Sequence, residues 1–120
     1  KFVKIFVDQN DIQLQKIYAE TDICFGSAGI SIWERIFFNI PNIIINPNSF
    51  QLHLSDFLVN NNIVKVIQFS TRHLSNRNKM LINIFLKHQH LKTKMIKFGS
   101  KLVDGKGLEN IINFINNETF

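Results

Sequence analysis

The sequence predicts an α/β domain with a Rossmann-like parallel sheet and helices on both faces. Short apolar runs alternate with longer amphipathic stretches, as they do where crossover helices connect parallel strands. The apolar runs, residues 43–45 for example, do not alternate with polar residues, which is typical of strands covered on both faces. The 120 residues, 45% hydrophobic and 19% charged, suit one globular domain, so residues 1–120 are treated as a single unit.

The strands are expected where Val, Ile and Phe gather, and the helices where apolar residues recur at spacings of three and four. Polar residues 8–11 offer caps for the first helix, and Pro41 breaks the chain before the third strand. The expected strands are residues 2–7, 23–25, 43–45 and 63–67. The expected helices are residues 12–18, 30–38, 50–60, 75–89 and 108–115, and residues 99–107 are expected to form a polar, glycine-containing connection.

The chain has one cysteine, Cys24, so no disulfide can form within it, and a reducing, cytoplasmic location is expected. No apolar run reaches the roughly 18 to 20 residues of a membrane span, and no signal-peptide pattern opens the chain. Because the sequence starts at Lys1 and not at a methionine, we expect that an upstream part exists.

The net charge of +5 is unevenly distributed. Residues 57–103 contain no Asp or Glu but nine Lys or Arg residues. Such a stretch attracts anions, whether nucleic acid, acidic lipid or a phosphorylated ligand. A solvated face of a lysine-rich protein explains it equally simply and is the interpretation we favour. Nucleic acid is not the favoured partner, because no interleaved aromatic residues or known motif accompany the charge.

The most informative segment is residues 23–35, a strand followed by a turn of small residues and a helix. Gly26 and Gly29 allow close approach of the backbone to a ligand or to other backbone. The first turn of the helix leaves free N–H groups, which suit a phosphate or diphosphate. The segment is neither a complete G-x-G-x-x-G motif nor a Walker loop.

Glu34 lies one helical turn beyond the small-residue turn, where its carboxylate can accept hydrogen bonds from a ribose diol. Ser31 and Glu34 also have the spacing of a capping box, in which they would only close the helix N-terminus, and the spacing does not decide between these. We expect Trp33 to belong to the core and Arg35 to pair with a carboxylate at the surface, without a chemical role.

Residues 19–35 (AETDICFGSAGISIWER) resemble the nucleotide-sugar signature of GT-B-fold proteins, and most closely that of the UDP-sugar hydrolases of pseudaminic acid biosynthesis. The resemblance continues through residues 38–45, the Phe50-Gln51 pair and the Asp-Gly-Lys-Gly step at residues 104–107. It implies the C-terminal, nucleotide-binding half of a two-domain GT-B fold. The catalytic histidine of that family belongs to the other half, so the catalytic residues of this chain are unknown.

The resemblance implies a UDP-sugar ligand and roles for nine residues. Phe25 would lie near the uracil, and Gly26 would open the turn. The backbone from Ser27 through Ala28 and Gly29 to Ile30 would hold the diphosphate, and Ser31 would add a hydroxyl. Glu34 would bind the ribose, and Gln51 would approach the sugar or a phosphate.

The implied reaction of the whole protein is hydrolytic release of UDP from UDP-2,4-diacetamido-2,4,6-trideoxy-β-L-altropyranose, and this chain alone is expected to be inactive. The alternatives are the nucleotide-sugar-binding half of a GT-B glycosyltransferase and a non-enzymatic nucleic-acid-binding module. No cofactor or metal is expected, because His88 and His90 cannot share one face of a helix and no carboxylate or thiol lies nearby in sequence. Asp104 is either a turn-forming residue or a sugar contact.

Overall fold

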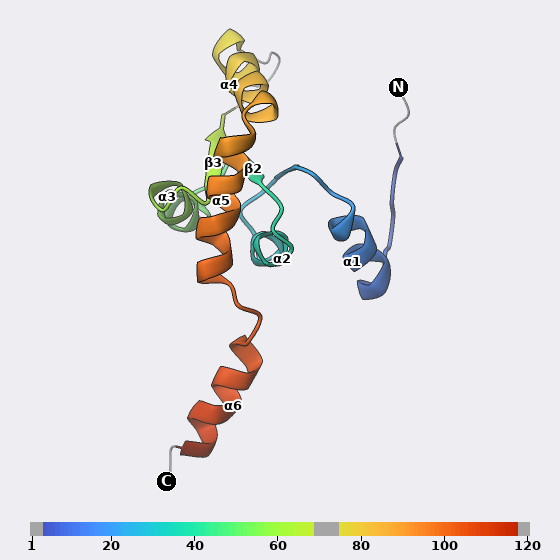
Figure 1. The fold of residues 1–120 in the computed structure, drawn as a ribbon, viewed down its shortest axis with the longest axis vertical. Coiled ribbons are helices and arrows are strands. Elements are labelled where there is room, and N and C mark those ends of the chain that lie inside the picture. The colour runs from blue at the N-terminus through green and yellow to red at the C-terminus, as the bar shows by residue number, and fades with distance from the viewer. Residues whose placement is uncertain (1–3, 69–74, 118–120) are drawn as a thin grey trace.

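The computed structural model describes residues 4–68 and 75–117, and it confirms the α/β fold with a Rossmann-like parallel sheet (Figure 1). Three strands pair in the order β1-β2-β3, and both pairings are parallel. The strands are β1 (Cys24–Gly26), β2 (Asn42–Ile45) and β3 (Val64–Ile67). The helices are α1 (Asp11–Ala19), α2 (Ser31–Phe37), α3 (Leu52–Asn60), α4 (Asn76–Lys87), α5 (Gln89–Leu102) and α6 (Gly107–Asn117).

Helices cover both faces of the sheet, and each face has its own hydrophobic cluster. On one face, Ile44 and Val64 pack with Ile32 of α2 and Leu58 of α3. On the other face, the alternate strand residues pack with α4 and the first half of α5. That second cluster consists of Ile43, Ile67, Phe85 and Met95. Burial on both faces explains why the strands read as continuous apolar runs.

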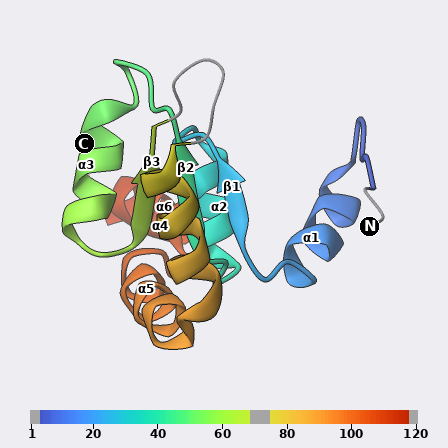
Figure 2. The same ribbon diagram turned by 90° about the horizontal axis from the view of Figure 1, so that it is seen from above.

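Helix α5 lies against the amino-terminal edge of the sheet. Gly99 packs so closely on Ile36 that an added Cβ would lie 2.9 Å from the Ile36 Cγ2, and 3.6 Å from that of Ile63, the residue preceding β3. Figure 2 shows α5 at the opposite end of the domain from the loop that joins β2 to α3. The carboxyl-terminal edge, where ligands bind in open parallel sheets, is therefore the edge that α5 leaves uncovered.

Asparagines end the two helices that lead into β2 and β3. Asn39 (φ 58°) follows α2 and Asn62 (φ 58°) follows α3, both in the left-handed conformation that Asn tolerates better than most residues. After each, a buried isoleucine turns back: Ile40 N–H donates to Arg35 O, and Ile63 N–H donates to Leu58 O. These bonds are the Schellman arrangement, with asparagine in the place usually taken by glycine.

Helix α1 projects from the body of the domain in both views, and α6 projects from it in Figure 1 (Figures 1 and 2). The radius of gyration is 16.6 Å, whereas a compact domain of this length would have about 14 Å. Helix α1 is closed by a capping box between Asn10 and Gln13, as the polar residues before it predicted, and Tyr18 joins it to α2 by packing on Phe38. Every residue of α6 is exposed, including its apolar stripe.

The structure corrects the sequence analysis at three places. The expected strand over residues 2–7 is wrong for residues 4–7, which are irregular and exposed because no neighbouring strand pairs with them; residues 2 and 3 lie outside the described residues. The helix expected over residues 75–89 ends at Lys87. Residues 99–102, expected to begin a connection, are instead the last turn of α5, a helix that was not predicted. The remaining strands and helices are confirmed to within about two residues.

Candidate functional site

The small-residue turn connects β1 to α2 at the carboxyl-terminal edge of the sheet. Strand β1 ends at Gly26, and residues 27–30 lead into Ser31, the first residue of α2. The loop that follows β2 and ends at Gln51 emerges at the same edge, because β1 and β2 are parallel neighbours. Seven of the nine sequence-predicted residues thus belong to β1 or to the loops that follow β1 and β2, and the other two, Ser31 and Glu34, belong to α2.

The turn presents a run of unbonded backbone donors. The N–H groups of the five residues from Ser27 to Ser31 donate no hydrogen bond to any part of the chain that the structure describes. The next two amides are satisfied, because Ile32 N–H donates to Gly29 O and Trp33 N–H donates to Ile30 O. Ala28 is buried in the core and fixes the turn from below, whereas Ser27 is exposed and Ile30 is 86% exposed. Five consecutive free amides at one turn are the donor set that an anionic oxygen needs.

Arg35 holds the turn from beneath, which makes the expected surface ion pair wrong. Only 5% of the residue is exposed, and its guanidinium bonds to the segment preceding it. The Nη2 donates to Ser27 O (2.6 Å), the Nη1 to Cys24 Sγ (3.2 Å) and the Nε to Ser31 O (3.2 Å). It forms no ion pair with any carboxylate in residues 4–68 or 75–117.

The two glycines of the turn have different roles. A Cβ at Gly26 would collide with the Arg35 Nη1, so glycine is required there for the guanidinium to lie against the backbone. A Cβ at Gly29 would meet only the Ser27 Oγ, at an ordinary 3.7 Å. Neither glycine has a positive φ among the described residues. Close approach is thus confirmed for Gly26, and within the chain itself Gly29 needs no special space.

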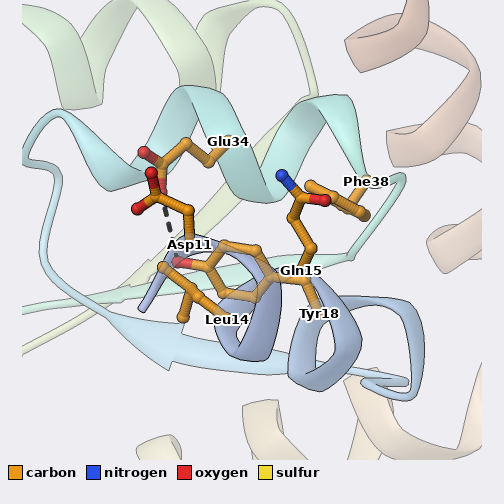
Figure 3. Close-up of a pocket in the computed structure, with 6 residues that line it drawn as sticks. All are labelled: Asp11, Leu14, Gln15, Tyr18, Glu34 and Phe38. Carbon is orange, nitrogen blue, oxygen red and sulfur yellow. Dashed lines mark hydrogen bonds between the residues drawn. The ribbon is translucent and has the colours of Figure 1, made fainter. Parts of the chain in front are cut away.

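Glu34 does not form the capping box. The N-cap of α2 is Ile30, and among the described residues no side chain caps the amides at the start of the helix. Glu34 instead lines a shallow groove of about 170 Å³ between α1 and α2, together with Asp11, Leu14, Gln15, Tyr18 and Phe38 (Figure 3). The Tyr18 hydroxyl donates to the Glu34 Oε2 at 3.4 Å. Partial burial and then the nearby Glu34 charge raise the pKa of Tyr18 above its ordinary value of 10.0.

The other two predicted contact residues flank the turn. Gln51 precedes α3 and exchanges bonds with Asn48: Gln51 N–H donates to the Asn48 Oδ1 (3.0 Å), and Asn48 N–H donates to the Gln51 Oε1 (3.4 Å). Phe25 is 42% exposed and lies on the opposite face of the sheet from Gly26, because neighbouring residues of a strand alternate. Trp33 packs against the core cluster, as expected.

Two residues of this site were not assigned by the sequence analysis, Arg35 and Tyr18. The position of Arg35 had a signal: it shares a helix face with Ile32 and Ile36, three and one residues away, and both are fully buried. The sequence carries no signal for the contact between Tyr18 and Glu34 beyond the place of Tyr18 on the apolar side of the first helix. Asp104 forms a turn, since its Oδ1 accepts from Lys106 N–H (2.9 Å) beside Gly105 (φ 76°).

No protein-family model, curated protein or solved structure matches this chain. Among the described residues there is no group of three or more His, Cys, Asp or Glu side chains placed to hold a metal ion, and His73 lies outside them. None of the helices that the structure describes has the length and apolar character needed to cross a membrane. The candidate site is therefore argued from its own geometry.

Proposed function

We propose that this chain binds a nucleotide sugar of the UDP class, with the diphosphate on the turn between β1 and α2. The observation that carries this proposal is a run of five amides, Ser27 to Ser31, that donate to no described residue and lie at the sheet edge that α5 does not cover. Unpaired backbone N–H groups are costly unless water or a ligand satisfies them. Phosphate oxygens accept several such bonds at once without needing a side chain.

The remaining contacts follow from the places of the other residues. Glu34 is exposed, and its bond to Tyr18 is long, so a ribose hydroxyl can replace that partner at little cost. The Ser31 hydroxyl adds a donor beside the amides. Gln51 approaches the sugar or a phosphate from the neighbouring loop, and Phe25 offers an exposed ring to the uracil.

The reaction proposed for the whole protein is hydrolysis of the UDP-sugar with release of UDP, as in the pseudaminic acid pathway. Such a reaction requires a base to activate water and donors that stabilise the departing diphosphate. The turn supplies the donors. The base would come from an N-terminal GT-B half, so the isolated chain should bind UDP and turn over no UDP-sugar. Transfer of the sugar to an acceptor is the alternative reaction for the same binding mode.

Titration calorimetry with UDP and 2′-deoxy-UDP tests the proposal. The wild-type chain should bind UDP more tightly than the deoxy analogue, and Glu34→Gln should remove that preference while retaining diphosphate binding. Glu109→Gln is the matched control, because Glu109 is also an exposed first-turn glutamate, in α6. Absence of UDP binding by the wild-type chain would refute the proposed function, and an unchanged preference in Glu34→Gln would remove Glu34 from the site.

One observation favours a second candidate, a nucleic-acid-binding surface on α5. His90, Lys94, Lys97 and Lys101 recur at spacings of four, three and four, which places them in one stripe, and all are exposed. Binding of a short duplex that weakens steeply with salt and is unaffected by excess UDP would support this function. Binding of UDP with no affinity for the duplex at physiological salt would exclude it.

A further inference from the structure

The guanidinium of Arg35 is a buried positive charge that forms no ion pair with a carboxylate in the described part of the chain. A guanidinium has five N–H donors, and the three hydrogen bonds of Arg35 use three of them. The three acceptors are two carbonyl oxygens and the sulfur of Cys24, and none of them is a carboxylate. A buried charge is costly unless it is both hydrogen-bonded and paired, and the described residues supply Arg35 with hydrogen bonds but with no carboxylate.

This charge lies directly beneath the unbonded amides. Its Nη atoms reach Cys24, the first residue of β1, and Ser27, the first residue of the turn. Gly26 contributes no side chain, so nothing separates the guanidinium from the backbone there. The bond from Nη2 also draws the Ser27 carbonyl toward the protein interior.

We propose that Arg35 is the positioning residue of the anion site. It fixes the turn through the carbonyls of Ser27 and Ser31, and its charge is the counter-charge for a diphosphate bound on the amides above. The inference rests on the proposed function and deepens it: Arg35 selects for the charged phosphate part of the ligand and contributes nothing to the nucleoside.

The test compares the affinities of UDP, inorganic pyrophosphate and uridine for wild type, Arg35→Lys and Arg35→Gln. Loss of the charge in Arg35→Gln should weaken UDP and pyrophosphate at least about tenfold and leave uridine unchanged. Arg35→Lys keeps the charge, so it should retain more than half of the affinity that Arg35→Gln loses for UDP and pyrophosphate. A purely structural role of the planar guanidinium would not allow this. Arg77→Gln, at an exposed arginine in the first turn of α4, is the control and should leave all three affinities unchanged.

A second measurement does not depend on the variants folding. In the wild-type chain, the Arg35 Nε–H resonance should shift when pyrophosphate is added and stay in place when uridine is added. A folded Arg35→Gln variant that binds UDP within twofold of wild type, or an Arg35 resonance that ignores pyrophosphate while UDP binds, would overturn the role of Arg35 and leave the proposed function standing. A wild-type chain that binds neither UDP nor pyrophosphate would overturn the proposed function, and the role of Arg35 with it.

Discussion

Gly26→Ala probes the contact between the turn and the buried guanidinium. The added Cβ would overlap the Arg35 Nη1 and lie 3.4 Å from the Cζ and 3.7 Å from the Nη2. The guanidinium must move, and hydrogen bonds from a charged group contribute about 1.5 to 3 kcal/mol each. Losing one or two bonds, offset by the roughly 0.5 to 1 kcal/mol that alanine gains over glycine, predicts a net destabilisation between about 0.5 and 5.5 kcal/mol, with a central value of about 2 to 3 kcal/mol. The backbone itself tolerates alanine, since the φ of Gly26 is not positive.

A double-mutant cycle separates this contact from any other cause. Urea unfolding, followed by the fluorescence of Trp33, the single tryptophan of the chain, gives the free energy of unfolding for each variant. In an Arg35→Ala background the Cβ has room, so Gly26→Ala should stabilise the chain by roughly 0.5 to 1 kcal/mol, which makes the coupling about 3 kcal/mol. Gly29→Ala is the control and should not destabilise the chain, since its Cβ would meet only the Ser27 Oγ at an ordinary 3.7 Å. Effects of the two changes that add to within about 0.5 kcal/mol would refute the account of Gly26.

Three further predictions concern the groove, the core and a helix end. Because Tyr18 is the only tyrosine, an absorbance titration should give its pKa directly, above 10.0 in wild type and lower in Glu34→Gln. The raised pKa of Tyr18 contributes stability that is present below pH 10.0 and is lost as the pH rises through that pKa. A Tyr18 midpoint that is the same in both proteins would show that the Glu34 charge does not act on Tyr18. Phe85→Ala should lower the free energy of unfolding, measured in urea, by about 3 to 5 kcal/mol, because Phe85 is buried in the core. Phe50→Ala, at an exposed phenylalanine, should lower it by less than about 0.5 kcal/mol, and equal losses would contradict the assigned core. Asn62→Gly should preserve stability whereas Asn62→Ala loses about 1 kcal/mol in the same assay; equal stability of the two would argue against the left-handed helix end.

The sheet and its turns were predictable because their signals are local. The runs that became β2 and β3 are largely apolar, with Lys65 the polar exception within β3, and each run follows an asparagine in the left-handed conformation that ends the preceding helix. The turn at Gly26 was predictable for the same reason: small residues between an apolar strand and an amphipathic helix.

Helix α5 was missed although its apolar residues carry a helical spacing. Leu91, Met95, Phe98 and Leu102 recur at four, three and four, but residues 90–98 were not assigned to any element and Gly99 was placed in a polar connection. The structure explains that glycine by tertiary contact, since α5 approaches Ile36 closely there. The N-terminal strand failed for the opposite reason: residues 4–7 have strand composition, but a strand also requires a neighbour, which composition cannot supply.

Within the candidate site, the sequence indicated the turn but not its support. A charged residue is exposed by default, so Arg35 was assigned to the surface despite sharing a face with buried isoleucines. Arg35 can be buried because Gly26, nine residues earlier, has no side chain to occupy the same space. The two residues meet only in the folded chain, so the sequence alone does not show their contact.

Amide chemical shifts measured during a UDP titration test the central claim most directly. If the turn binds the diphosphate, the ¹H–¹⁵N resonances of residues 27–31 should shift strongly with UDP and with pyrophosphate, and hardly at all with uridine. Shifts confined to the lysines of α5 or to the groove at Tyr18, with residues 27–31 unmoved at saturating UDP, would contradict it.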